Sequence, residues 1–212
     1  MILIHAQPLT IQDFKPYGSI ISPNEEVFKL DESAKNANQG TAIKIMKVSE
    51  IQNQFSEKVP VPNWNIFRCF PQHHLRRTFL ESIKRPNCTV THDIKVLEKH
   101  PYSSQTFLPM GRAEDDISYL VVVALPNPAC DAPDLSTLKA FTCKGNQAVT
   151  YGAGIWHAPM IVLGTPPYLD FGVLINELLD NGHPEKDCVE TFYEEGQLQI
   201  TLIAANETKC QK

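Results

Sequence analysis

The sequence predicts a mostly β protein with a few short helices, and three observations lead to that prediction. Short runs of β-forming residues recur along the whole chain. Turn-forming residues separate most of these runs, as in Pro126-Asn127-Pro128 and Lys144-Gly145-Asn146. Long stretches with helical periodicity are few, and the 16 prolines disfavour them. Many short strands at such spacing are typical of an antiparallel barrel or sandwich.

Several segments have the residue pattern of strands. They are residues 19–22, 41–48, 64–70, 94–98, 106–109, 119–125, 138–143, 147–151, 160–163, 169–176 and 198–203. The run 119–125 reads Tyr-Leu-Val-Val-Val-Ala-Leu and lacks the apolar–polar alternation of a half-exposed strand. We therefore expect it to be a central strand that is covered on both faces.

Three segments have helical features. Thr10 is a suitable cap for a short helix ending near Phe14. Residues 73–84 carry apolar side chains four apart, and residues 134–138 read as one helical turn before a strand. We expect long loops within 24–40 and 71–93, and a frayed tail over 207–212.

Length and composition indicate one soluble globular domain spanning residues 1–212. The chain is 42% hydrophobic and 20% charged, and its net charge of −5 argues against a nucleic-acid surface. No apolar run approaches the roughly 20 residues of a membrane helix, and the amino end is too short for a secretory signal. Six cysteines without a CxxC pair favour reduced thiols and a cytoplasmic location.

Four polar residues have the spacing of a cupin site. Small double-stranded β-helix barrels of the cupin class often read H-x-H-x₃₋₄-E in one hairpin and P-x-G-x₂-H in the next. This chain has Glu98-x-His100-x₄-Gln105 and then a Gly-x-Gly-x₂-His motif that ends at His157. Glu98 and His100 are two residues apart, so on a strand they point to the same side.

The chemistry of that set leaves two interpretations open. Glu98, His100, Gln105 and His157 could ligate a divalent metal ion, although more weakly than three imidazoles would. A barrel with these groups could equally hold a polar ligand without metal, so no cofactor is certain. The alternative for each histidine is an ordinary hydrogen-bonded packing residue. The remaining histidines are expected in solvated loops: His5, His73, His74, His92 and His183.

Two further residues are candidates for substrate binding. Arg68 alternates with Phe67 and Cys69, and an arginine inside a barrel needs an anionic partner such as a substrate carboxylate. The alternative is a rim arginine in contact with solvent. Trp156 precedes His157 and would form either a wall of the pocket or part of the packed core.

A series of short motifs in a fixed order resembles the ureidoglycolate lyase family. The motifs lie at residues 97–101, 104–109, 119–124, 133–141, 145–147 and 156–159, with further matches at 170–171 and 187–190. The resemblance runs from about residue 9 to residue 195. Residues 72–93 look longer than in bacterial members and are similar to those of fungal members.

The resemblance implies a cupin-like antiparallel β-barrel of the double-stranded β-helix type, usually a homodimer. It implies a reaction that splits (S)-ureidoglycolate into glyoxylate and urea, late in allantoin breakdown. On that chemistry we expect His100 to be the principal acid or base and His157 its partner or a metal ligand. Glu98 would orient His100 or share the metal, and Gln105 would bind the urea or complete the metal shell. Arg68 would hold the substrate carboxylate.

Three other functions remain as alternatives. A hydrolase acting on the amide bond of the same substrate would release ammonia instead of urea. A cupin without catalytic activity would only bind a small molecule. A metal-dependent dioxygenase of the cupin class is less favoured, because Glu98 stands where a second imidazole is usual.

Overall fold

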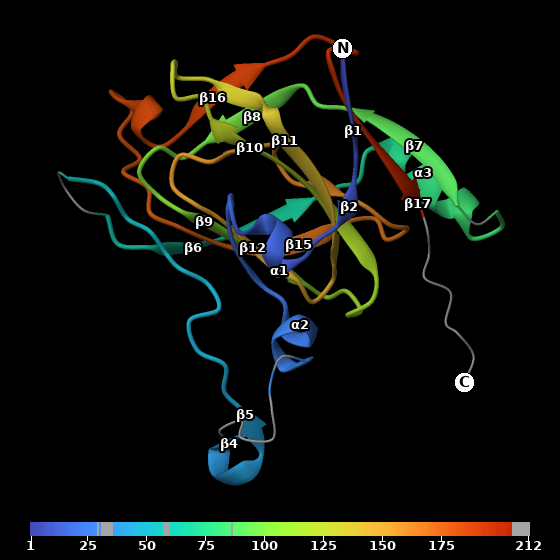
Figure 1. The fold of residues 1–212 in the computed structure, drawn as a ribbon, viewed down its shortest axis with the longest axis horizontal. Coiled ribbons are helices and arrows are strands. Elements are labelled where there is room, and N and C mark those ends of the chain that lie inside the picture. The colour runs from blue at the N-terminus through green and yellow to red at the C-terminus, as the bar shows by residue number, and fades with distance from the viewer. Residues whose placement is uncertain (29, 31–35, 57–59, 86, 205–212) are drawn as a thin grey trace.

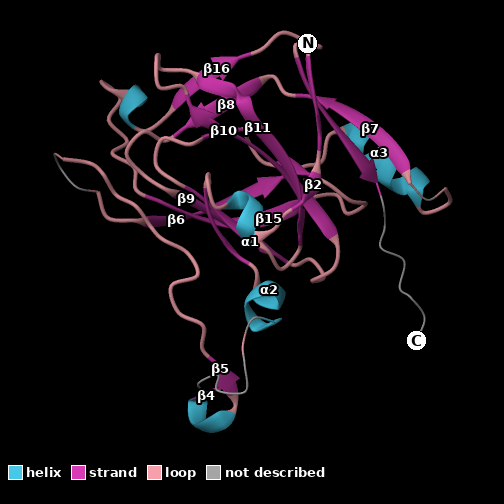
Figure 2. Cartoon of the chain, viewed as in Figure 1, coloured by secondary structure: helices cyan, strands magenta, loops and turns pink. Residues whose placement is uncertain are grey.

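The computed structural model describes residues 1–28, 30, 36–56, 60–85 and 87–204, and within these ranges the chain is mostly β (Figures 1 and 2). The helical segments are short: α1 (Ile11–Phe14), α2 (Pro23–Phe28), α3 (His73–Ser82) and the 3₁₀ turns Asn38–Gly40 and Pro184–Lys186. None of the described helices is long and apolar enough to cross a membrane. The predicted mostly β class is therefore confirmed.

The largest sheet has the strand order β16-β8-β13-β10-β11-β2, and β14 also pairs with β10. Its strands are β2 (Gln7–Pro8), β8 (Val96–Lys99), β10 (Ile117–Pro126), β11 (Pro133–Lys144), β13 (Trp156–His157), β14 (Ile161–Val162) and β16 (Val189–Phe192). All pairs in it are antiparallel except the short contact of β2 with β11.

A second, antiparallel sheet has the order β3-β12-β9-β15-β6. Its strands are β3 (Gly18–Ile21), β12 (Ala148–Tyr151), β9 (Gln105–Met110), β15 (Leu169–Ile175) and β6 (Asn63–Cys69). A third sheet has the order β1 (Ile2–His5), β17 (Leu198–Ala204) and β7 (Cys88–Asp93). The pair β4 (Asn36–Ala37) and β5 (Ala42–Ile43) lies away from the main body (Figure 1).

Strand β10 separates two hydrophobic clusters, as its sequence predicts. Tyr119, Val121 and Val123 pack toward the five-stranded sheet, in a cluster that also holds Phe107 and Phe171. The alternate residues 120, 122 and 124 pack in a second cluster with residues of β17 and α3. The protein therefore has three layers: the five-stranded sheet, the seven-stranded sheet, and β1-β17-β7 with α3.

The sheets of the described chain do not join into one closed, hydrogen-bonded barrel. The five-stranded sheet ends at β3 on one side and at β6 on the other. Residues of both sheets, such as Tyr119 of β10 and Phe171 of β15, pack in one cluster. The two sheets therefore face each other as a cupin-like sandwich. This corrects the closed barrel that the family resemblance implies and agrees with the sandwich that the strand spacing left open.

The helix predictions have mixed outcomes. Thr10 caps α1 by accepting a hydrogen bond from the Asp13 amide at 3.1 Å, as expected. Helix α3 is confirmed and buries Leu75 and Phe79. The helical turn expected at 134–138 is wrong, because this segment belongs to β11. Asp134 Oδ1 accepts the Ser136 amide at 3.0 Å, so a local turn at the start of β11 explains the misleading pattern.

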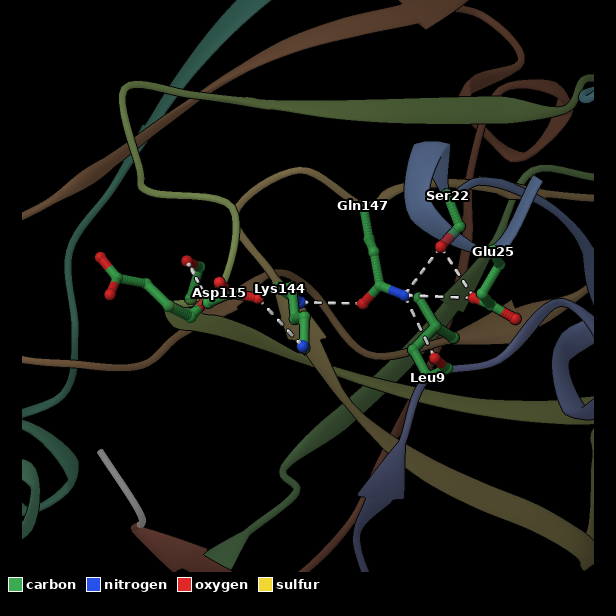
Figure 3. A network of polar contacts seen from close by, with 8 residues as sticks. Leu9, Ser22, Glu25, Asp115, Lys144 and Gln147 are labelled. Atoms are coloured by element: carbon green, nitrogen blue, oxygen red, sulfur yellow. Dashed lines mark hydrogen bonds and ion pairs between the residues drawn. The ribbon is translucent and has the colours of Figure 1, made fainter. Parts of the chain in front are cut away.

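A buried amide fixes the amino-terminal segment on the sheets (Figure 3). Gln147 Nε2 donates to the Leu9 carbonyl at 3.2 Å and to Ser22 Oγ at 3.1 Å, and lies 3.4 Å from Glu25 Oε1. Its oxygen accepts the Lys144 amide at 3.0 Å. A buried amide with all these partners stabilises the turn between β11 and β12. The predicted tail at 207–212 lies outside the described residues.

Candidate active site

The four predicted polar residues meet near the crossing of the chain from β8 of the large sheet to β9 of the five-stranded sheet. Glu98 lies on β8, His100 directly follows it, Gln105 begins β9, and His157 ends β13. His157 is the register partner of Glu98. Ligand atoms of Glu98, His100 and His157 all lie within 4.8 Å of one another, and Gln105 Oε1 is 3.2 Å from His157 Nε2. The spacing in the sequence therefore reflects one shared site.

Backbone carbonyls fix both imidazole rings. His100 Nδ1 is 2.6 Å from the carbonyl oxygen of Asp187, and His157 Nδ1 is 3.0 Å from that of Ile155. A carbonyl oxygen can only accept, so each Nδ1 carries the proton and donates it. In the neutral rings, Nε2 of each histidine then carries a lone pair, and that of His157 faces the side-chain amide of Gln105. His100 Nε2 is buried and has no hydrogen-bond partner among the described residues.

Burial sets the protonation of these groups. It lowers the pKa of His157 to about 3, with a smaller contribution from His100, and it lowers the pKa of His100 as well. Burial, with a smaller contribution from the nearby carboxylate of Glu190, raises the pKa of Glu98 to about 7. At neutral pH both imidazoles are uncharged, whereas Glu98 exchanges a proton close to neutrality.

Tyr151 is a site residue that the sequence reasoning missed. Its ring stacks on His157 with centroids 4.0 Å apart and planes at 10°. It is the register partner of Gln105 across β12 and β9, and its hydroxyl is buried without a partner. The available signal was its position directly before the Gly-x-Gly-x₂-His motif, at the end of a predicted strand.

Arg68 does not lie at this site, which corrects the expected carboxylate contact. Its Nε and Nη2 donate to Asp170 at 2.8 and 2.9 Å, and its side chain is 54% exposed. On β15, Asp170 pairs with Arg68 whereas Ile175 pairs with Gln105. Five residues of strand separate the two positions, or about 17 Å. The alternative of a rim arginine is the one the structure supports.

Trp156 also lies away from the site, on the opposite face of β13 from His157. Its side chain is fully buried in the cluster that contains Leu120 and Leu198. Lys99 Nζ lies 4.9 Å from the centre of the Trp156 ring. The pocket-wall interpretation is therefore wrong and the packing alternative holds, because neighbouring residues of a strand face opposite sides.

The donor set fits a divalent metal ion. Two imidazole nitrogens and one carboxylate oxygen converge, and the unpartnered His100 Nε2 is an atom that an ion would satisfy. Each imidazole is oriented through its other nitrogen by a backbone carbonyl, as is usual for metal-ligating histidines. Glu98, His100 and His157 would be the ligands, with Gln105 beside them.

The fold and the site together define a cupin-like enzyme with an imidazole and carboxylate centre. A family model described as "Ureidoglycolate lyase" matches residues 1–201. The chain therefore belongs to the ureidoglycolate lyase family.

Individual relatives agree with this assignment. The chain is 55% identical over 202 residues to the ureidoglycolate lyase of Saccharomyces cerevisiae, covering 95% of this chain and all of the relative. It is 39% identical to that of Schizosaccharomyces pombe, covering 87% and 88% of the two chains. It is 31% identical to that of Burkholderia mallei, covering 77% and 78%.

Proposed function

We propose that this protein is a ureidoglycolate lyase that eliminates urea from (S)-ureidoglycolate and releases glyoxylate. Membership of the family supports the substrate, and the near-complete overlap with the yeast relative supports the reaction. The observation that carries the chemistry is the convergence of Glu98, His100 and His157 within 4.8 Å, with an unpartnered imidazole nitrogen.

The reaction needs one base and one acid. The central carbon of ureidoglycolate bears a hydroxyl, a carboxylate and the urea nitrogen. A base removes the hydroxyl proton, the oxygen forms the carbonyl of glyoxylate, and the carbon–nitrogen bond breaks. An acid protonates the departing nitrogen, so that urea leaves as a neutral molecule.

His100 is the base that we assign, because its Nε2 has a free lone pair and its Nδ1–H is held by Asp187. Glu98 is the acid, because a carboxyl group with a pKa of about 7 holds a proton in much of the enzyme at neutral pH. His157 has a pKa of about 3 and therefore stays neutral. It acts as a ligand or as a hydrogen-bond acceptor, and Gln105 orients the urea group from beside it.

In a metal-bound form, Glu98, His100 and His157 would be ligands and would not act as acid and base; the ion would instead polarise the substrate hydroxyl and lower its pKa. Whether or not an ion is bound, water has little access to the two imidazoles, because both are buried.

The decisive experiment is incubation of purified, metal-quantified protein with racemic ureidoglycolate, followed by assays for glyoxylate, urea and ammonia. Stoichiometric glyoxylate and urea, with only the (S) enantiomer consumed, is the expected result. Ammonia in place of urea would establish the amide hydrolase instead. Oxygen consumption would establish the dioxygenase, and binding without turnover would establish the non-catalytic cupin.

We also propose that the chain acts as a homodimer, and β6 supports this. The strand is the outer edge of its sheet and leaves its outer backbone groups without a strand partner in the described chain. Large apolar side chains are exposed on it and on its neighbours: Trp64, Ile66, Phe67, Phe70, Leu108, Met110 and Tyr168. A long apolar edge of this kind is normally covered by another chain.

The same proposal includes one domain over residues 1–212 and a cytoplasmic location. The two outer layers pack on opposite faces of strand β10 in the middle layer, which supports one folding unit. The cysteines in the described part of the chain are free thiols: Cys69, Cys88, Cys130, Cys143 and Cys188. Free thiols are usual in a reducing compartment.

A further inference from the structure

A cavity of about 480 Å³ lies outside the site described above. Helix α3, strand β7 and the segment after His157 line it, with His74, His92, Asp93 and Glu195 among its polar residues. Apolar side chains such as Ile94 and Ile161 complete the wall. Glu98, His100, Gln105 and His157 do not line it, so the proposed lyase chemistry leaves this cavity unexplained.

Two imidazoles come together at this cavity. The sequence placed His74 and His92 in solvated loops, but His74 lies on α3, and His92 lies on β7 with only 4% of its surface exposed. His92 Nδ1 is 3.2 Å from His74 Nε2, with ring centroids 5.2 Å apart and planes at 22°. One shared proton accounts for a hydrogen bond between these nitrogens.

The spacing of these nitrogens also suits two ligands of one metal ion. Zinc–imidazole bonds are about 2.0–2.1 Å long, so two such ligands at a tetrahedral ion have nitrogens about 3.3 Å apart. The observed 3.2 Å is close to that value. To bind an ion, each ring would turn so that its lone pair points at the ion and not at the other nitrogen.

The two rings are neutral nitrogen donors, and charges of both signs surround them. Burial lowers the pKa of His92 to about 4 and also lowers the pKa of His74, so both rings are neutral at neutral pH. Asp93 raises the pKa of both rings, whereas Arg77 lowers that of His74 and Lys95 lowers that of His92. The cavity wall carries two carboxylates, Asp93 and Glu195, against the single ammonium of Lys95.

We propose that His74 and His92 form a binding site for a divalent transition-metal ion of the zinc, nickel or copper class, separate from the proposed active site. Within the described residues, the only set of three or more potential ligand atoms in mutual reach is that of Glu98, His100 and His157. The new site therefore has two protein ligands and takes water or a small ligand at its remaining positions. The bound ion would join α3 to β7.

The test uses a protein whose other potential metal site has been removed. In the Glu98→Gln, His157→Asn background, calorimetric titration with Ni²⁺ is expected to show one bound ion per chain. Adding His74→Ala should weaken that binding at least tenfold. The matched control is His73→Ala, the neighbouring exposed histidine of α3, which should leave the affinity unchanged.

A spectroscopic measurement distinguishes this pair from scattered surface histidines. Electron paramagnetic resonance of Cu²⁺ bound to the background protein should show coupling to two imidazole nitrogens, reduced to one or none by His74→Ala. His74 is half-buried and its substitution spares the core, so the test does not depend on replacing His92. Equal Ni²⁺ affinity in the His74→Ala and His73→Ala proteins, or a Cu²⁺ signal unchanged by His74→Ala, would overturn the proposal.

Discussion

Each of the two site imidazoles, His100 and His157, donates a hydrogen bond through Nδ1, and this leaves its Nε2 lone pair directed toward the site. The carbonyls of Asp187 and Ile155 hold the Nδ1 protons, so both Nε2 atoms present lone pairs to the same space. Asp187 is itself fixed, since its carboxylate accepts the amides of Leu178 and Leu179 at 2.7 and 2.6 Å. Rigid support of this kind is what a site needs to keep its reacting atoms aligned.

His100→Ala removes the assigned base. We expect turnover of ureidoglycolate to fall by about 10²-fold or more, because positioned acid–base groups contribute 10²–10⁴-fold. Steady-state assays of released glyoxylate measure this, and circular dichroism checks that the fold is retained. The control is His183→Ala, because His183 is exposed and lies directly before the 3₁₀ turn Pro184–Lys186. Activity of His100→Ala close to that of the wild type would remove His100 from the mechanism.

Glu98→Gln tests the assigned acid. The folded pKa of Glu98 is about 7, so the proton-bearing form is lost as pH rises through 7. The rate of the wild-type enzyme should therefore decline above neutrality, with an inflection near pH 7. In Glu98→Gln the rate should be much lower and should show no inflection there. A retained inflection would assign that titration to another group.

Tyr151 is expected to position His157 through its ring and not through its hydroxyl. The stacked ring at 4.0 Å restricts the imidazole, whereas the buried hydroxyl has no partner to lose. Tyr151→Phe should keep at least half of the activity, and Tyr151→Leu should lower kcat about tenfold or more with a smaller change in KM. A larger loss in Tyr151→Phe than in Tyr151→Leu would contradict this role.

The residues that the sequence misplaced share one physical cause. Glu98, His100, Gln105 and His157 could be found because same-face spacing on strands and the turn between them bring distant groups together. Arg68 and Trp156 could not be placed, because their surroundings depend on which strands form and how these pair, and no strand was predicted at 156–157. Only the pairing of β6 with β15 shows that Asp170 neutralises Arg68. Trp156 precedes His157 and for that reason faces the opposite side.

At the scale of elements, apolar patterning was the most reliable signal. The run 119–125 predicted a doubly covered strand, and β10 has one cluster on each face. The prediction for segment 134–138 failed, since Asp134 accepts both the backbone amide and the hydroxyl of Ser136 and so imitates a helix start within β11. Sheet membership was not predictable, because it depends on pairing between distant segments.

Strand β6 carries the prediction about assembly. Antiparallel pairing of two copies about Ile66 would set Trp64 of one copy opposite Arg68 of the other, a favourable cation–π arrangement. Ile66 is 78% exposed, so Ile66→Lys should not disturb the monomer, but it should prevent edge pairing. Analytical ultracentrifugation should show a wild-type dimer and a mutant monomer.

The control for this surface is Ile203→Lys, an exposed apolar position on β17 in a different sheet. That variant should remain a dimer. A monomeric wild-type protein at micromolar concentration would contradict the homodimer, and a dimeric Ile66→Lys protein would place the interface elsewhere.

At the scale of the whole molecule, three layers explain how so many polar groups can be buried. Strand β10 supplies apolar side chains to both neighbouring layers, which stabilises the sandwich from its centre. The stacked layers then hold His92 in one interior region and His157 in another, each with a pKa far below the ordinary value for histidine. Burial of two neutral histidines makes the stability of the whole fold depend on pH.

The sign of that dependence follows from the shifts. The unfolded chain binds protons at His92 and His157 near pH 6.5, whereas the folded protein binds them only near pH 4 and 3, so stability is lost as pH falls below 6.5. Glu98 acts in the opposite direction, because its folded pKa of about 7 exceeds its unfolded value. His92 and His157 against Glu98 leave a loss of about 1.4 kcal/mol per pH unit between pH 6 and 5. The lowered pKa values of His100 and His74 add to this loss.

Urea unfolding at pH 5.0, 5.5 and 6.0 measures this slope, and two variants should change it in opposite directions. His92→Gln removes one of the histidine contributions, so its slope should be smaller than that of the wild type by about 1.4 kcal/mol per pH unit. Glu98→Gln removes the opposing contribution, so its slope should be larger by about the same amount. A wild-type stability that rises as pH falls from 6 to 5 would show that His92 and His157 are protonated in the folded protein, contrary to their burial among the packed layers.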